Sequence, residues 1–343
     1  MGLRKWLGRG EPEERTIDPA AYGYVPRQHI RADRAGPAPD FDVVDPLVAR
    51  GNWPELAAFL RTVPMVSERR FALLTRLGNA ATANDAWLRQ WLAADPRSVN
   101  ALCVYAESQV NKAWEIRSSD WAKNVSREQW QGFFRVLRAV PDICAAAMEP
   151  EPADPAPFIA LQTAALGLRW SNDEYRKLWR EISARAPHSF TATHRAWNYW
   201  RPRWYGSLEL VEEFVETAIA AAPPGSVLTM NRIQMLHEEF RPKDGDERAA
   251  FDRGDRVNRA LSAGIADAAA ADPADIKLPY LRHWLAARLV RAGRHRESMN
   301  QFWAVGGYCG AEPWEWFDDP LDQFCAVRAE TTLAWEDAGR PTS

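Results

Sequence analysis

Apolar residues recur along this chain at the spacing of a helix face. Residues 208–218 repeat their apolar positions every three or four residues, and so does the segment that contains Trp130, Phe133, Phe134, Leu137 and Val140. No stretch alternates apolar and polar residues with the period of two that a half-buried strand requires. The pattern therefore predicts an all-α protein with a helix content above roughly 60%.

Short polar motifs divide this pattern into separate helices. An acidic residue before proline favours a helix start, because the carboxylate caps the first N–H groups and proline lacks one of the N–H groups that need a partner. Four such pairs occur, at Asp45-Pro46, Asp95-Pro96, Asp272-Pro273 and Asp319-Pro320. Ser126 to Gln129 and Ser171 to Glu174 also fit the reciprocal capping box. These six signals predict one helix after another.

The helix-opening prolines are regularly spaced. Pro155, Pro187 and Pro223-Pro224 lie 32 and 36 to 37 residues apart, which brackets the length of a repeat built from two antiparallel helices. Residues 280–303 place large and small apolar residues on either side of the turn residue Gly293, as paired helices need. We therefore expect an α-solenoid of antiparallel helix pairs.

Several units resemble the tetratricopeptide family and its degenerate relatives, because they share an alanine, a turn glycine and a terminal proline without the full consensus. The segment Pro202-Arg203-Trp204-Tyr205-Gly206-Ser207, together with residues 114–130 and 194–240, is similar to an uncharacterised bacterial family of helical-repeat proteins. The resemblance spans most of residues 45–305. It implies the helical-repeat fold and no particular activity.

The chain is expected to begin with an arm. Residues 1–40 contain five prolines and little apolar periodicity, so they lack the surface that would offset the entropy of ordering. We expect a flexible arm whose removal leaves the melting temperature nearly unchanged. Residues 41–343 then form a single helical repeat domain, with 110–155 as an elongated or inserted unit and 311–343 as a C-terminal capping helix.

Charge and composition limit the classes of function. The 343 residues carry 43 Lys and Arg against 46 Asp and Glu, a net charge of −3, which disfavours nucleic acid as a partner. Few lysines among many arginines are typical of a GC-rich bacterial genome. The chain has no secretory leader pattern and no apolar run of about 18 residues, so we expect a cytoplasmic protein without stable membrane insertion. Its four separated cysteines are expected to be buried, reduced thiols.

Familiar catalytic and cofactor motifs are missing. The glycine-rich stretch 306–310 lacks the spacing of a nucleotide loop, and neither a nucleophile elbow nor a zinc-binding His-Glu-x-x-His occurs. The acidic segment 312–322 is explained better by capping and packing than by a cation site. We therefore expect no metal and no cofactor, and an enzyme is the less favoured class.

One segment combines positive charge with aromatic rings. No acidic residue lies between Glu181 and Glu209, where Trp197, Arg201, Arg203 and Trp204 occur. Guanidinium groups and indole faces together bind planar acceptors or anions. The alternative is a structural role inside the protein, in which the arginines cap helix carbonyls and stack on indoles.

Two histidines extend this segment into a predicted groove. His194 shares a helix face with Trp197 and Arg201, and His237, beside Glu238, falls on a helix of the next repeat, 43 residues later. The candidate binding residues are His194, Trp197, Arg201, Arg203, Trp204, His237 and Glu238.

The leading hypothesis is an interaction module whose groove, around residues 190–240, binds a protein or peptide partner that carries acidic groups. The alternative is an enzyme or sensor of a small anionic ligand that uses His194, His237 and Glu238 as acid/base groups beside the arginines. Each histidine has a simpler interpretation as a hydrogen-bonded core residue.

Overall fold

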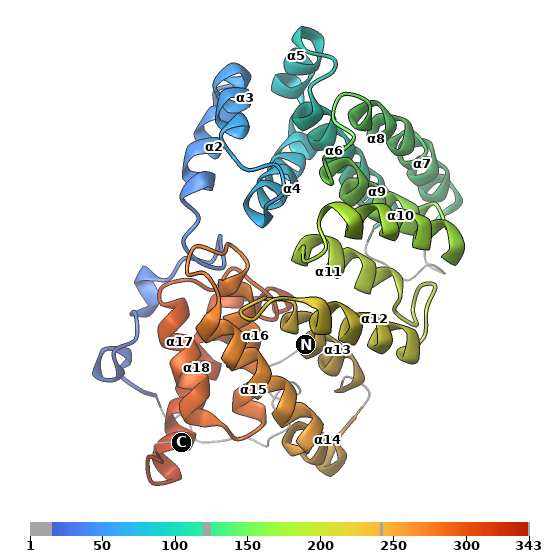
Figure 1. Cartoon of the computed structure of the whole chain (residues 1–343). Coiled ribbons are helices and arrows are strands. Elements are labelled where there is room, and N and C mark those ends of the chain that lie inside the picture. Colours follow the sequence, from blue (N-terminus) through green and yellow to red (C-terminus); the bar gives the residue numbers. More distant parts are fainter. Residues whose placement is uncertain (1–15, 119–124, 241–242, 342–343) are drawn as a thin grey trace. The chain divides into compact units, whose positions relative to one another are not determined.

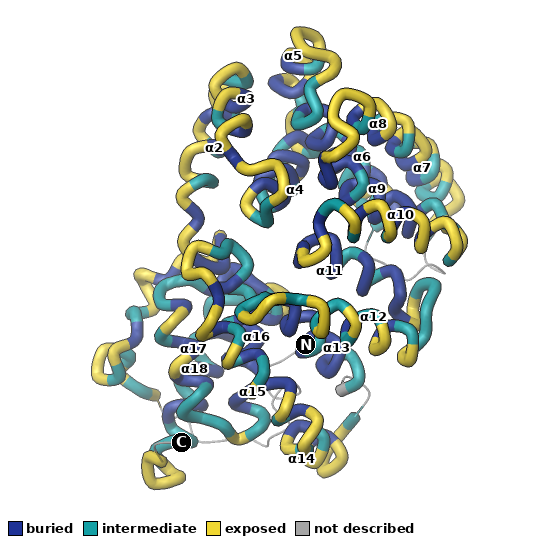
Figure 2. The backbone as a smooth tube through the Cα atoms, viewed as in Figure 1, coloured by how far each residue is buried: buried dark blue, intermediate teal, exposed yellow. Residues whose placement is uncertain are grey.

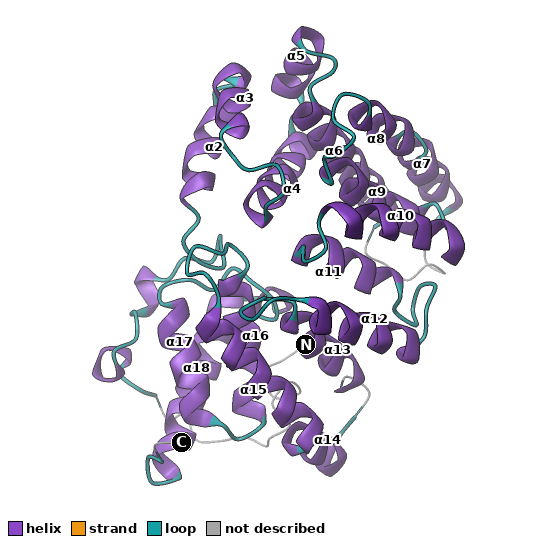
Figure 3. Cartoon of the chain, viewed as in Figure 1, coloured by secondary structure: helices purple, strands orange, loops and turns teal. Residues whose placement is uncertain are grey.

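The protein is built from helices. The computed structural model describes residues 16–118, 125–240 and 243–341, so residues 1–15 of the predicted arm lie outside it. Helices account for 70% of the described residues, which include no strand (Figure 3). The predicted all-α class and helix content are therefore confirmed.

The first group of α-helices runs as far as the turn at residues 200–207. These helices are α2 (Pro39–Ala49), α3 (Trp53–Arg61), α4 (Glu68–Ala83), α5 (Ala86–Ala94), α6 (Val99–Arg117), α7 (Arg127–Leu137), α8 (Val140–Met148), α9 (Ala156–Gly167), α10 (Asn172–Arg185) and α11 (Phe190–Tyr199). The remaining α-helices are α12 (Leu208–Ala221), α13 (Thr229–Phe240), α14 (Gly245–Arg253), α15 (Asp255–Ala270), α16 (Leu278–Arg291), α17 (His295–Val305) and α18 (Pro320–Asp337).

The chain divides into two compact units rather than the single domain expected from the sequence. Residues 39–214 form one, which we call the inserted unit, and residues 1–38 with 215–343 form the other, which we call the split unit. The chain leaves the split unit at residue 38 and returns to it at residue 215, inside α12. A repeat pattern along the sequence does not reveal this division, because both units are made of the same kind of helix.

In the inserted unit, helices follow one another from α2, blue in Figure 1, to α11, yellow-green. Four of them pack in a closed order, since α4 contacts α6, α6 contacts α9, α9 contacts α11, and α11 contacts α4. Figure 2 shows buried residues concentrated on α6 and α9. The predicted elongated unit, residues 110–155, contains the end of α6 followed by α7 and α8, both of which pack against α6.

Both predicted capping boxes are present. The Ser126 and Ser171 hydroxyls accept the backbone N–H of Gln129 and Glu174, whose side chains accept the N–H of the two serines. Asp319 also caps α18 as predicted, because its carboxylate accepts the N–H of Asp322.

The other three Asp-Pro signals were wrong as helix starts. Pro46 lies inside α2, which begins seven residues earlier, and Asp95 ends α5. The Asp272 carboxylate accepts the N–H of Ala274 in a turn, and α16 begins only at Leu278. Aspartate stabilises turns by the same local hydrogen bond that it makes in a cap, so the dipeptide alone does not separate the two.

The second part of the predicted arm is folded, which corrects the expectation of a flexible segment up to residue 40. Residues 16–38 form two short 3₁₀ helices, η1 (Pro19–Tyr22) and η2 (Arg27–His29). Tyr24 and Ile30 are buried in one core with residues of α16, α17 and α18. Two of the prolines that argued against a core instead open these turns, since Pro19 begins η1 and Pro26 directly precedes η2.

Backbone contacts fix this arm along its length. Arg31 donates its N–H to Gly307 and accepts that of Cys309, and Gly310 donates to the Arg34 carbonyl. Glycine is required at position 310, because a Cβ there would lie 2.4 Å from the Arg34 nitrogen. The predicted C-terminal capping helix is α18, preceded by a 3₁₀ turn, η4 (Trp314–Trp316).

One core histidine joins the arm to this C-terminal region. His283 is completely buried and its Nε2 lies 2.9 Å from the Ala35 carbonyl oxygen, while its Nδ1 lies 3.0 Å from Trp314 Nε1. A carbonyl only accepts and an indole N–H only donates, so His283 is neutral with its proton on Nε2. Burial lowers the pKa of His283 to about 4, against the opposing effect of the Ala35 carbonyl.

We expect this histidine to make the split unit sensitive to acid. The depressed pKa means that the unfolded chain, with an ordinary value of 6.5, takes up the proton first. Stability present above pH 6.5 should therefore fall by roughly 3 kcal/mol as the pH decreases to about 4. Urea unfolding at a series of pH values would measure this. In His283→Gln, which keeps one donor and one acceptor without titrating, the loss should be smaller; equal pH dependence in both proteins would contradict the assignment.

Candidate functional site

The residues predicted from the sequence fall in both units. His194, Trp197, Arg201, Arg203 and Trp204 belong to the inserted unit, whereas His237 and Glu238 belong to the split unit. A groove that joins the two histidines therefore stays a prediction, and the two sets are described separately.

The α11 residues form a stacked column. The His194 ring lies between Phe190 and Trp197, with centroid distances of 5.5 and 5.1 Å. The Arg201 guanidinium lies 4.6 Å from the Trp197 ring and donates to the Asn198 side chain. Trp197 and Arg201 are both buried, which favours the packing interpretation for these two side chains.

Arg195, on the same helix, lies in the arginine-rich segment but was not among the candidate binding residues. It forms two hydrogen bonds with the Glu107 carboxylate on α6, of 2.8 and 3.0 Å, and a third with the Ile159 carbonyl on α9. Burial opposes its charge, but the attraction of Glu107 outweighs that penalty and raises the pKa of Arg195. This ion pair fills the space between α4, α6, α9 and α11.

The start of α11 is also tied to α4. The Glu68 carboxylate accepts the Ser189 hydroxyl at 2.6 Å and both the N–H and the hydroxyl of Thr191. A carboxylate from a neighbouring helix thus caps α11, in keeping with the positive end of a helix dipole. The hollow that remains beside Glu107 and Arg195 is only about 10 Å³, too small for a ligand.

The turn after α11 presents the predicted Arg203 and Trp204. Arg203 is exposed and its guanidinium lies 5.9 Å from the Trp204 ring. The turn folds back tightly, since a Cβ on Gly206 would come within 1.8 Å of the Trp200 carbonyl oxygen. This close return holds Trp204 edge to face against Trp114 of α6, with ring centroids 5.8 Å apart.

Around this contact the fold gathers further aromatic rings and arginines. We call the group the aromatic–arginine cluster, and it consists of Trp114, Arg117, Trp130, Arg169, Arg203 and Trp204. The Arg117 guanidinium lies 5.3 Å from the Trp114 ring and 5.2 Å from the Trp130 ring. Arg169, exposed just after α9, lies 5.9 Å from the Trp130 ring. Sequence reasoning identified the last two members, and the other four needed the packing of α6, α7 and α9.

Two indole donors of this cluster are buried without an acceptor. Neither Trp114 Nε1 nor Trp204 Nε1 has a hydrogen-bond partner in the described residues, although both atoms are shielded from solvent. A buried donor without an acceptor costs about 1–3 kcal/mol, so such atoms are uncommon in packed proteins. Among the described residues, Trp87 Nε1 and Trp197 Nε1 are also buried without an acceptor, but only in this cluster do two such donors belong to rings in contact.

His237 occupies a different environment in the split unit. It is buried on α13, and its ring lies 5.3 Å from Trp284 of α16 and 4.9 Å from Trp316 of η4. The neighbouring Glu238 is half-buried. Trp284 and Trp316 also contact each other, so the three rings form a packed aromatic group.

Residues 16–118, 125–240 and 243–341 contain no group of three or more His, Cys, Asp or Glu side chains arranged to hold a metal ion. In the same ranges no helix is long and apolar enough to cross a membrane. Three of the four cysteines are buried as expected and Cys325 is half-buried; burial raises the pKa of Cys309 to about 12.

Comparison with known proteins finds one similarity. Residues 72–169 match the model of a domain family of unknown function, DUF4034. No curated protein and no solved structure matches the chain. The match covers less than a third of the 343 residues, and it includes four of the six members of the aromatic–arginine cluster: Trp114, Arg117, Trp130 and Arg169.

Proposed function

We propose that the chain is a tetratricopeptide-like α-solenoid that binds an acidic segment of a protein partner at the aromatic–arginine cluster. The repeat architecture is supported by the order of contacts in the inserted unit, where α2 packs on α3 and α4, and α3 packs on α5. Helix pairs stacked in this way expose extended surfaces without catalytic groups.

The unpaired indole donors carry the proposal. A partner carboxylate that reaches Trp114 Nε1 or Trp204 Nε1 after a small movement of the rings would give a buried N–H group its acceptor. In the free protein, each buried N–H group without an acceptor costs free energy. A partner oxygen that accepts from it removes that cost, which adds to the free energy of binding.

Positive charge at the rim favours the same partner. Arg169 and Arg203 are exposed, and Arg169 forms no ion pair with any carboxylate in the described ranges. Their guanidinium groups lie over Trp130 and Trp204, so side-chain freedom is already reduced before a partner arrives. Arginine pairs strongly with carboxylates because its planar fork makes two parallel hydrogen bonds.

His194 and His237 do not enter this proposal, because each ring lies against aromatic side chains. The acid/base role considered from the sequence needs a substrate within hydrogen-bond reach of these rings. Neither histidine lines the hollow beside Glu107 and Arg195.

The proposal predicts selective, salt-dependent binding of acidic peptides. In an array of peptides with paired Asp/Glu and Asn/Gln versions, the acidic member of a pair should bind the protein more tightly. Arg169→Ala and Arg203→Ala should each weaken that binding at least tenfold while leaving urea unfolding nearly unchanged. Fluorescence titration would measure peptide binding by each variant, because three tryptophans lie at the site.

Two variants complete this test. Arg89→Ala removes another exposed arginine of the same unit, paired with Asp85 at the start of its own helix, and should leave peptide binding unchanged. Trp197→Ala leaves a cavity in the core and should lower the free energy of unfolding by about 3–5 kcal/mol. The proposal fails when neutral peptides bind as well as acidic ones, or when the Arg203 and Arg89 variants bind alike.

A further inference from the structure

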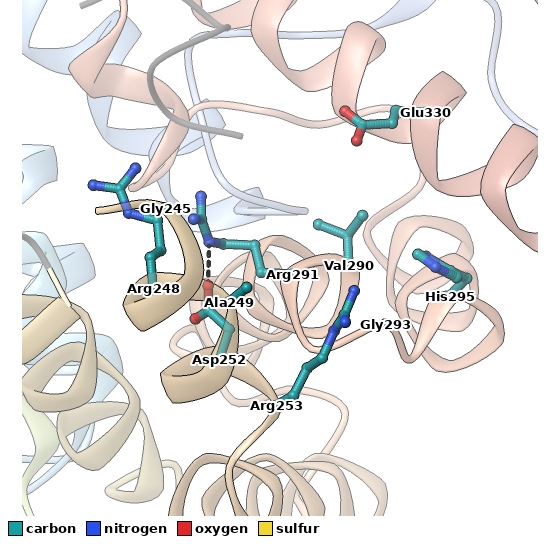
Figure 4. A pocket seen from close by; sticks show the side chains of 10 residues that line it. All are labelled: Gly245, Arg248, Ala249, Asp252, Arg253, Val290, Arg291, Gly293, His295 and Glu330. Carbon is teal, nitrogen blue, oxygen red and sulfur yellow. Dashed lines mark hydrogen bonds and ion pairs between the residues drawn. The ribbon is translucent and has the colours of Figure 1, made fainter. Parts of the chain in front are cut away.

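Arginine is abundant in both units, and many of its side chains have a carboxylate partner inside the protein. In the split unit, Arg291 lines a pocket of about 140 Å³ and forms an ion pair with the buried Asp252 (Figure 4). In the inserted unit, Arg195 is paired with Glu107. The arginines that are exposed without such a partner are therefore the ones that a bound anion can engage.

Two arginines of this kind lie at the ends of a row of rings in the inserted unit. The Arg169 guanidinium lies 5.9 Å from the Trp130 ring, and Trp130 stacks on Phe134 with ring centroids 5.6 Å apart. At the other end, the Arg138 guanidinium lies 5.7 Å from the Phe134 ring. We call these four residues the α7 row, because Trp130 and Phe134 lie on α7 and Arg138 directly follows it.

The spacing of a helix aligns three members of the α7 row. Trp130, Phe134 and Arg138 follow one another at intervals of four residues, which places them on one face about one turn apart. Among the described helices, α7 packs mainly against α6.

Positive charge flanks a strip of apolar surface in the α7 row. Arg138 and Arg169 are both exposed, and neither forms an ion pair with a carboxylate of residues 16–118, 125–240 or 243–341. The Trp130 and Phe134 rings between them are half-buried. Each guanidinium is already held against a ring, so a bound carboxylate would cost less side-chain entropy.

The backbone at Arg169 has a conformation that glycine usually adopts. Arg169 follows the last turn of α9 with a φ of 62°, and the N–H of Trp170 returns to the Ala165 carbonyl. Glycine is the usual residue at such a position, because a side chain there costs free energy. Strained residues cluster at functional sites. An arginine at this position therefore indicates a use for its side chain.

We propose that the α7 row binds a partner segment in which two acidic residues flank an apolar one. Each carboxylate pairs with one of the guanidinium groups of Arg138 and Arg169, and the apolar side chain covers the rings between them. This inference rests on the proposed function, because Arg169 also belongs to the aromatic–arginine cluster. It adds a second anionic contact at Arg138 and an apolar contact between the two.

The three contacts of the α7 row limit the spacing of the acidic residues. Together they place the guanidinium groups of Arg138 and Arg169 at most about 17 Å apart. An extended chain covers that distance in about five residues. We therefore expect the two acidic residues of the partner to lie within about five positions of each other.

Synthetic peptides with uncharged ends test this pattern. Two glutamates are placed at separations of two to five positions around one leucine, and matched versions carry glutamine in place of either glutamate. The tightest two-glutamate peptide should bind at least tenfold more strongly than its one-glutamate versions, measured by fluorescence titration. Arg138→Glu should abolish this difference, and Arg138→Ala should reduce it.

Arg169→Gly separates a binding role from a structural one. Glycine adopts a φ of 62° without strain, so this variant should resist urea at least as well as the unmodified protein. It should nevertheless bind the two-glutamate peptide at least tenfold more weakly. Lower resistance to urea together with unchanged binding would assign Arg169 a purely structural role and overturn the proposal.

Arg61→Glu is the matched control for Arg138→Glu. Like Arg138, Arg61 is an exposed arginine at the C-terminal end of a helix, and it has neither an ion pair nor a ring contact in the described residues. The same change of charge there should leave peptide affinity unchanged.

Two results would overturn the α7 row and leave the proposed function intact. One is an equal loss of affinity in the Arg61→Glu and Arg138→Glu variants, and the other is equal binding of one-glutamate and two-glutamate peptides by the unmodified protein. If no acidic peptide binds, the proposed function and this inference both fail.

Discussion

Replacement of Asp154 by alanine should lower the free energy of unfolding of the inserted unit by about 3–5 kcal/mol. Asp154 and Arg70 form a two-pronged ion pair, with N–O distances of 2.8 and 2.7 Å, and their side chains are only 3% and 5% exposed. Without the carboxylate, the Arg70 charge stays buried. The variant also loses the hydrogen bond from the Ala156 N–H to Asp154, at the start of α9.

Urea unfolding followed by tryptophan fluorescence would measure this loss. Asp173→Ala is the matched control, because Asp173 is 88% exposed and pairs with Arg176 on its own helix, so its removal should cost less than about 1 kcal/mol. Replacing both buried partners, as Arg70→Met with Asp154→Leu, should recover most of the loss, since an apolar pair leaves no buried charge. A cost for Asp154→Ala no larger than that for Asp173→Ala would show that the pair is not needed.

Removal of residues 1–38 should destabilise the split unit strongly, in contrast to the expectation from the sequence. Burial of Tyr24 and Ile30 contributes roughly 3–6 kcal/mol. The deletion also removes the Tyr22 carbonyl bonded to Trp303 and the Val25 carbonyl bonded to Arg328. We expect the melting temperature of the split unit to fall by many degrees.

A shorter truncation serves as the control for this deletion. Comparison with a protein that lacks only residues 1–15 assigns the change to residues 16–38, and Tyr24→Ala tests the largest buried contact without shortening the chain. The packing described for the arm would be contradicted if both truncated proteins melted at the same temperature.

Local chemistry made the helices predictable. The hydroxyls of Ser126 and Ser171 meet their partners three residues away, so the two capping boxes depend on nothing outside their own turn. The wrong helix starts have separate causes: Asp272 makes the same side-chain hydrogen bond in a turn, Asp45 lies inside α2 with its carboxylate on Arg76, and Asp95 follows the end of α5.

The arm could not be predicted in the same way. Its stability comes from contacts with residues about 300 positions later, such as the Tyr24 hydroxyl with Thr332 and the Val25 carbonyl with Arg328. A pattern read within a short window contains no information on such contacts.

The candidate sites were also predicted only in part, because the fold brings in residues from distant parts of the sequence. Unusual density of arginine and tryptophan pointed to Arg203 and Trp204, but the ring that contacts Trp204 is Trp114 of α6, 90 residues earlier. The ion pairs of Asp252 with Arg288 and Arg291 left a weaker trace, the charged run 243–256, in which Asp252 is the one carboxylate that becomes deeply buried.

The division of the chain into a split and an inserted unit determines the order in which they are completed during translation. Residues 39–214 leave the ribosome as one continuous stretch, so the inserted unit has all its residues before the other unit does. Tyr24 and Ile30 are synthesised long before α16 to α18, and must remain without their core until those helices emerge. A nascent chain therefore exposes this apolar segment for most of its synthesis, which makes it a natural binding site for a chaperone during that time.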